Sequence, residues 1–143
     1  NKNVKNARIV AMVSVSSNTQ SATAGARKLL EENPQINLLV GFNEWSTLGV
    51  GMAIKELGLK DRVCAIGFDN NTECVGMLET GELDTLIVQN PFSMGYLAVM
   101  NAANILSGKK TESVIKTDVY VVDRSNMFSA DVQKILFGFD KYD

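Results

Sequence analysis

The stretch RVCAIGFDNN, residues 62–71, gives the clearest indication of the fold. Its apolar run at residues 63–66 is short and contains no polar residue, as expected of a strand that is covered on both faces. Residues 67–71, which end in three polar side chains, follow directly and predict a turn that opens the next helix. In open α/β sheets, ligands bind where strands end at the carboxyl edge, because loops converge there above a rigid sheet. The stretch therefore predicts a parallel strand that presents Asp69 at such an edge.

Two other apolar runs end in a polar residue in the same way. The run at residues 38–42 precedes Asn43, and the run at residues 86–88 precedes Gln89. Asn43 and Asp69 also suit helix N-caps, where a side-chain oxygen accepts a hydrogen bond from an otherwise unpaired backbone N–H. A plain turn does not need the glutamine that stands before Asn90-Pro91. Three such groups at one sheet edge could hydrogen-bond a polyol, so Asn43, Asp69 and Gln89 are the main candidates for ligand binding.

Trp45 and Asn18 are further candidates. The aromatic face of Trp45 could stack on the apolar face of a sugar ring, although an aromatic residue between a strand and a helix is more often part of the core. Asn18 belongs to the polar cluster that follows the apolar run at residues 7–15, where it also suits a helix N-cap. Both are expected at the same edge as the three main candidates.

Strand-like and helix-like segments alternate along the chain. Pro91 suits a first helical turn, and Gly58 and Gly81 suit left-handed helix ends. This alternation predicts an α/β fold with an open, mainly parallel sheet and helices on both faces, in three layers. We expect strands over residues 7–15, 36–42, 63–66, 83–89 and 114–122, and helices over residues 20–32, 44–57, 72–80, 92–106 and 130–136.

The composition argues against several function classes. The 143 residues include no histidine, which removes Ser-His-Asp and Cys-His catalysis and most zinc chemistry. A net charge of −2, spread evenly, gives no sign of a nucleic-acid or anionic membrane partner. Neither a dinucleotide fingerprint nor a phosphate-binding loop is present, so we expect no cofactor, no metal and no enzymatic activity. Cys64 and Cys74 are expected to be unpaired thiols, and we expect no membrane span and no signal peptide in this sequence.

Three motifs carry a family resemblance. They are N-E-x-x-x-L-G at residues 43–49, G-F-D at residues 67–69 and Q-x-P-x-x-M-G-Y at residues 89–96. In this order, they resemble the C-terminal part of a type I periplasmic sugar-binding protein of the ribose- and galactose-binding kind, and the resemblance covers nearly the whole chain. In that family the matching Asn, Asp and Gln hydrogen-bond the sugar, which the resemblance implies for Asn43, Asp69 and Gln89.

The resemblance also implies a domain organisation. Family members have two lobes with the ligand between them, so residues 1–143 would be a fragment of the C-terminal lobe. The helix over residues 92–106 would belong to the other lobe. The opening strand–helix unit of the C-terminal lobe would be missing, and its strand would normally lie between the strands at residues 7–15 and 36–42. We therefore expect the fragment either to rearrange its sheet or to pair with a second copy as a homodimer.

The resemblance implies non-enzymatic binding of a small sugar-like solute outside the cytoplasm of a bacterium. Closure of the two lobes would present a surface to the membrane permease of an ABC-type uptake system or to a chemosensory receptor. The main rival hypothesis is the effector-binding domain of a lac-repressor-type transcription regulator, which shares the fold and part of the pattern. Two weaker hypotheses are a doubly wound enzyme that uses Asp69 as a base and an oligomerisation module.

Overall fold

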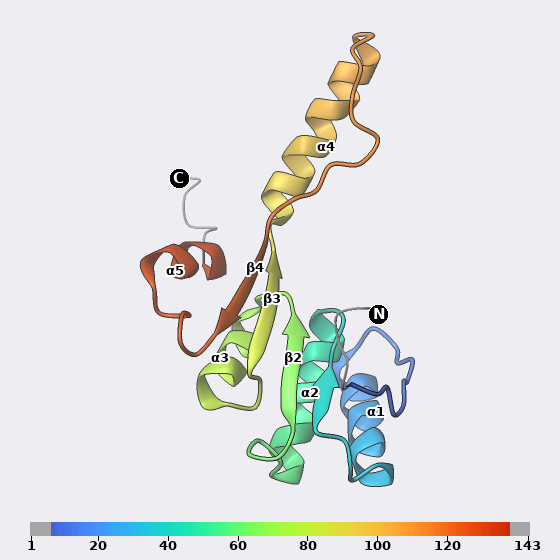
Figure 1. Cartoon of the computed structure of the whole chain (residues 1–143), viewed down its shortest axis with the longest axis vertical. Helices are drawn as coiled ribbons and strands as arrows, with labels where there is room; N and C mark the ends of the chain where they lie inside the picture. The colour runs from blue at the N-terminus through green and yellow to red at the C-terminus, as the bar shows by residue number, and fades with distance from the viewer. Residues whose placement is uncertain (1–6, 138–143) are drawn as a thin grey trace.

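The structure is a computed structural model that describes residues 7–137 (Figure 1). The helices over 44–57, 72–80 and 130–136 match the expected bounds. Three of the strands are shorter than expected, whereas the strand expected over 63–66 is one residue longer and ends two residues later. The helices are α1 (Thr19–Glu32), α2 (Glu44–Leu57), α3 (Thr72–Thr80), α4 (Pro91–Leu106) and α5 (Ala130–Leu136), and the strands are β1 (Leu38–Val40), β2 (Cys64–Phe68), β3 (Thr85–Gln89) and β4 (Val119–Asp123).

The four strands form one sheet in the order β1-β2-β3-β4. The strands β1, β2 and β3 are parallel, and β4 pairs antiparallel with β3 at the edge. The fold is therefore α/β with an open, mainly parallel sheet, as the sequence predicts. None of the described helices is long and apolar enough to span a lipid bilayer.

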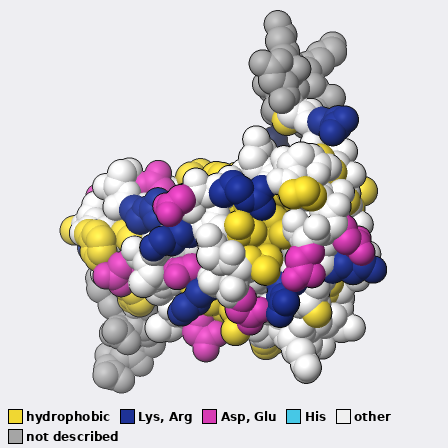
Figure 2. Space-filling view, turned by 90° about the horizontal axis from the view of Figure 1, so that it is seen from below, with side chains coloured by type: hydrophobic (Ala, Val, Ile, Leu, Met, Phe, Trp, Pro, Cys, Tyr) yellow, Lys and Arg dark blue, Asp and Glu magenta, His cyan; other side chains and the backbone are white. Residues whose placement is uncertain are grey.

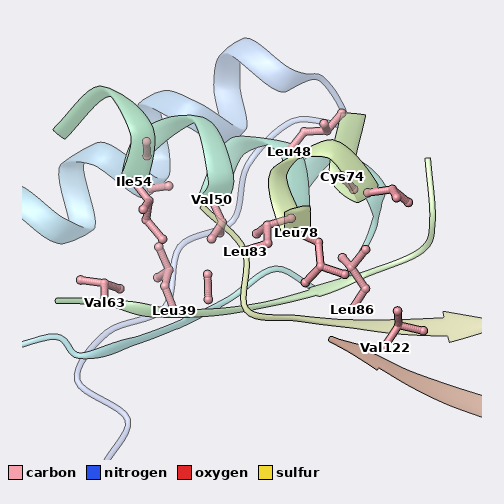
Figure 3. Packing of buried hydrophobic residues seen from close by; sticks show 14 of the residues in the cluster. Leu39, Leu48, Val50, Ile54, Val63, Cys74, Leu78, Leu83, Leu86 and Val122 are labelled. Carbon is pink, nitrogen blue, oxygen red and sulfur yellow. The ribbon is translucent and has the colours of Figure 1, made fainter. Parts of the chain in front are cut away.

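The core lies between one face of the sheet and the helices α2 and α3 (Figure 3). Leu39, Ala65, Leu86 and Val122 come from the four strands and are 8%, 0%, 0% and 0% exposed. They alternate with more exposed neighbours along each strand, as the period of two requires. Helix α1 packs against α2 rather than against the sheet.

The opposite face of the sheet is covered by no described helix. Leu38 and Val121 lie on that face and are 45% and 58% exposed. The connections β1–α2–β2 and β2–α3–β3 run in the same direction across the sheet, and right-handed crossovers in one direction place both helices on one face. The expectation of helices on both faces is therefore met on one face only, within residues 7–137.

The strand expected over residues 7–15 does not form. Residues 7–16 have no regular secondary structure, and Ile9 and Met12 are 78% and 83% exposed. Val13 and Val15 of this segment approach Gly25 of α1. An apolar run becomes a strand only when a neighbouring strand provides its hydrogen bonds, and β1 pairs with β2 alone. The remaining strands keep their chain order, so the sheet is not rearranged to fill the position beside β1.

Helix α4 projects away from the rest of the molecule, with residues 107–118 returning beside it (Figure 1). It has no buried residue, although it is rich in apolar side chains. Val99, Ile105 and Leu106 are 70%, 61% and 88% exposed. A helix with so many apolar side chains is normally buried at least in part, so its surface is suited to contact with another protein surface.

On one face of the molecule, the charged side chains show no such concentration. Seen from below, at the end of the molecule opposite α4, basic and acidic side chains lie interspersed with apolar ones (Figure 2). Several form exposed ion pairs, including Arg27 with Glu31 and Glu56. A surface of mixed charge such as this one does not provide the basic stripe that nucleic-acid binding requires.

Candidate ligand-binding site

The three main candidates lie at the carboxyl edge of the sheet. Asp69 is the first residue after β2. Because Phe68 pairs with Ile87, Asp69 lies level with the last residues of β3, which ends at Gln89. Asn43 follows β1 by three residues and begins α2. The sequence thus places all three side chains at one edge, although the turn between β1 and α2 is longer than the other two.

Asn43 is an N-cap, as its residue type predicts. Its Oδ1 accepts hydrogen bonds from the backbone N of Ser46 at 2.9 Å and from the Ser46 hydroxyl at 2.8 Å. The side-chain nitrogen of Asn43 has no hydrogen-bond partner within residues 7–137. The capping bonds therefore fix the side chain while leaving its N–H groups available to a ligand.

Asp69 combines a free carboxylate with an unusual backbone. Its carboxylate accepts no hydrogen bond from any described side chain or backbone group, and it lies partly buried. Its φ is +70°, the only positive value among the described residues other than glycine. An L-residue in this region costs about 1–2 kcal/mol, and such residues cluster at functional sites. The backbone N of Asp69 is held by the carbonyl of Ile87 at 3.0 Å.

Gln89 is exposed at the last position of β3. Its side-chain amide forms no hydrogen bond with the rest of the described chain. Its backbone still pairs with Val119 of β4, so the side chain projects from a rigid strand end. A free amide on a fixed backbone can both donate and accept a hydrogen bond.

Trp45 and Asn18 occupy less informative positions. Trp45 is 41% exposed in the first turn of α2, next to Asn43, where its ring is accessible. Asn18 caps α1 by accepting a hydrogen bond from the backbone N of Ser21 at 2.8 Å. No hydrogen bond joins Asn18 to the three main candidates, so its contact with a ligand remains a prediction.

The structure adds an aromatic pair that the sequence does not single out as a unit. The rings of Phe42 and Phe68 lie with centroids 6.1 Å apart at the ends of β1 and β2. Phe42 is 76% exposed, which is unusual for so large an apolar side chain. The repeated pattern of an aromatic residue followed by Asn43 or Asp69 is the sequence signal that points to this pair.

A hollow of about 460 Å³ lies beside Asp69, between the first turns of α2 and α3 and the end of α5. Asn70 donates to the carbonyl of Leu136 at 2.9 Å, which brings α5 to the same edge. Carboxylate and amide groups dominate its polar lining. Within residues 7–137, no group of three His, Cys, Asp or Glu side chains lies close enough together to hold a metal ion.

Cys74 lies in the first turn of α3 and is fully buried. Burial raises the pKa of its thiol to about 12, and the nearby carboxylates of Glu44, Glu73 and Asp69 act in the same direction. Burial also raises the pKa of Cys64, with a further contribution from Asp84. Both are free cysteines, and both favour the neutral thiol.

An open, mainly parallel sheet with free amide and carboxylate groups at its carboxyl edge is the arrangement expected of an α/β ligand-binding module. The family described as periplasmic binding protein domain matches residues 2–110. The chain therefore belongs to the periplasmic binding protein domain family.

Individual relatives agree with this assignment. The chain is 31% identical over 94 residues to the ribose import binding protein RbsB of Haemophilus influenzae, which covers 66% of this chain and 32% of that protein. The RbsB of Bacillus subtilis is 34% identical over 87 residues, covering 61% of this chain and 28% of that protein.

Among solved structures, a carbohydrate transporter solute binding protein from Agrobacterium radiobacter, in complex with D-arabinose, superimposes with a TM-score of 0.82 at 29% identity. That superposition covers 90% of this chain and 44% of the other chain. The chain thus spans about a third of the curated relatives and less than half of this solved relative.

Proposed function

We propose that this chain provides one side of a binding site for a small sugar-like solute and catalyses no reaction. The observation that carries the proposal is the presence of free polar groups on Asn43, Asp69 and Gln89 at one edge of the sheet. A carboxylate and two amides can accept from and donate to the hydroxyls of a sugar. One relative is named a ribose import binding protein and another is a carbohydrate transporter solute binding protein in complex with D-arabinose, which supports this class of ligand.

The domain organisation is part of the same proposal. The chain is a fragment of the C-terminal lobe of a two-lobed protein, and α4 packs with the other lobe. The exposed apolar surface of α4 supports this arrangement, because Val99 and Leu106 gain burial only from a surface outside the described chain. The uncovered face of the sheet, with Leu38 and Val121, supports it in the same way. A second copy of the chain is the rival partner for these two surfaces.

The proposed setting is extracytoplasmic, in a bacterial ABC-type uptake or chemosensory system. Lobe closure over the sugar would present a surface to a membrane permease or a receptor. The relatives named above are transport proteins, which favours this setting over gene regulation.

A thermal-shift screen of the full-length protein tests the proposal. The ligands are pentoses, hexoses, their alcohols and a few amino acids, each at high excess. A tight ligand stabilises the folded state by mass action, so a sugar should raise the melting temperature by several degrees. A protein that is folded and free of carried-over ligand, and that responds to no sugar, would contradict the proposal.

A further inference from the structure

Thr47 occupies an unusual position for a polar side chain, since it is fully buried in the first turn of α2. Its hydroxyl accepts a hydrogen bond from the backbone N of Phe68 at 2.8 Å and donates one to the carbonyl of Phe68 at 3.1 Å. One side chain therefore satisfies both backbone groups of the last residue of β2. The sequence provides no direct signal for this contact, because the two residues are 21 positions apart.

The side chain substitutes for a missing strand residue. Backbone groups of Cys64 and Ile66 face β1 and bond to Asn37 and Gly41. The backbone groups of Phe68 also face the β1 side of β2. However, β1 ends at Val40, so no residue of β1 lies opposite Phe68 to bond with these groups. Without Thr47, the N–H and C=O of Phe68 would be left without a protein partner on that side.

Two glycines make room for this contact. A Cβ at Gly67 would overlap the methyl group of Thr47, and a Cβ at Gly41 would come within 2.6 Å of the backbone N of Thr47. The first turn of α2 therefore sits directly on the ends of β1 and β2. The neighbouring Ser46 hydroxyl accepts from the backbone N of Phe42 at 2.8 Å and joins the same turn to the end of β1.

The consequence for the site follows from the planarity of the peptide bond. The carbonyl of Phe68 and the N–H of Asp69 belong to one peptide plane. The hydroxyl of Thr47 holds the carbonyl, and the carbonyl of Ile87 holds the N–H at 3.0 Å. The plane from which Asp69 projects is thus fixed from both sides, and this fixation sustains its φ of +70°.

We propose that Thr47 is a positioning residue for the ligand site, which fixes the backbone of Asp69 relative to the turn that carries Asn43. The proposal rests on the proposed function, because the positioned groups are those that would bind the sugar. Thr47 itself is fully buried and would not touch the ligand.

The test compares Thr47→Val and Thr47→Ser in the full-length protein. Valine keeps the shape but removes both hydrogen bonds, whereas serine keeps the hydroxyl. We expect Thr47→Val to weaken binding of D-ribose or D-arabinose, whichever the wild type binds, by tenfold or more, and Thr47→Ser to stay within threefold of wild type. Val63→Ala, a buried change at the opposite edge of the sheet, is the control for general destabilisation and should stay within threefold.

Backbone amide exchange provides a measurement that does not depend on sugar binding. The amides of Phe68 and Asp69 should exchange at least tenfold faster in Thr47→Val, relative to the core amide of Ala65, and not in Val63→Ala. If the wild type binds neither sugar but these amides respond as expected, the positioning of Asp69 stands and the choice of ligand is wrong. Unchanged amides in Thr47→Val, or an equal loss of binding in Val63→Ala, would overturn the inference.

Discussion

The side-chain amide of Asn71 donates a 2.8 Å hydrogen bond to the carboxylate of Glu44, and this bond joins the first turns of α3 and α2 beside Asp69. The same Asn71 side chain accepts from the backbone N of Cys74 at 2.8 Å as the N-cap of α3. One residue thus begins a helix and ties it to its neighbour. Both helix starts are thereby held at the carboxyl edge where the candidate ligand groups lie.

Asn71→Ala should lower the free energy of unfolding by about 1–2 kcal/mol, because it removes a capping bond and a bond to a charged group. Asn71→Ser retains a capping oxygen and should lose less. Urea unfolding monitored by circular dichroism measures both. Equal stability of wild type and Asn71→Ala would show that these bonds do not hold the two helices.

The backbone of Asp69 leads to a prediction about stability. At φ +70°, glycine is favoured over aspartate, and aspartate over alanine. Asp69→Gly should therefore be more stable than Asp69→Ala by about 1–2 kcal/mol, although both lack the carboxylate. Thermal unfolding of the two variants measures the difference. If alanine is as stable as glycine at this position, the backbone is not strained.

The thiol of Cys74 makes stability depend on alkaline pH. Its pKa is about 12 in the folded protein and 9.0 in the reference state. Folding favours the neutral thiol, so its contribution is fully present below pH 9 and is lost as the pH rises toward 12. Between these values, the free energy of unfolding should fall by about 1.4 kcal/mol per pH unit from this group.

Cys74→Ala isolates that effect. Its free energy of unfolding should fall less steeply above pH 9 than that of wild type, as measured by urea unfolding at pH 7, 9 and 10. Other groups that titrate at alkaline pH are common to both proteins and cancel in the comparison. Parallel curves for the two proteins would contradict the raised pKa.

The surface of α4 leads to a prediction about association. Val99 and Leu106 are exposed, so each of Val99→Gln and Leu106→Gln should change the free energy of unfolding of the 143-residue chain by about 0.5 kcal/mol or less. The double variant should show less concentration-dependent association than the wild-type chain in sedimentation velocity. Met12→Gln, at an equally exposed apolar residue outside α4, is the control. A wild-type chain that stays monomeric at high concentration would contradict the prediction that the apolar surface of α4 mediates association.

Local signals predicted the helices well. Pro91, Gly58 and Gly81 mark helix ends by their own backbone preferences, and the structure shows Gly58 and Gly81 with φ of +64° and +90°. Residues 7–15 show where such signals fail, because a strand depends on a partner that the local sequence does not contain. The prediction of a strand there was wrong for that reason.

The sequence predicted which residues form the candidate site and that they lie at the carboxyl edge of the sheet. Asn43, Asp69 and Gln89 follow strand ends, and parallel pairing brings those ends together. The positive φ of Asp69 and the role of Thr47 could not be predicted, because each depends on contacts between distant parts of the chain. Pattern-based reasoning finds residues that act through their position in an element, and misses those that act through tertiary contacts.

Direct hydrogen bonds from Asp69 and Gln89 to the ligand are the core of the proposed function. Isothermal titration calorimetry of the full-length protein tests these bonds, with the sugar that gives the largest thermal shift as ligand. The variants are Asp69→Ala and Gln89→Ala. The control is Asp61→Asn, which changes an exposed acid at the other edge of the sheet. We predict that Kd rises by tenfold or more in each of the first two variants and by less than threefold in Asp61→Asn, since loss of a ligand hydrogen bond costs about 1.5 kcal/mol or more. An Asp69→Ala protein that is folded and binds the sugar as tightly as wild type would contradict direct binding of the ligand by Asp69.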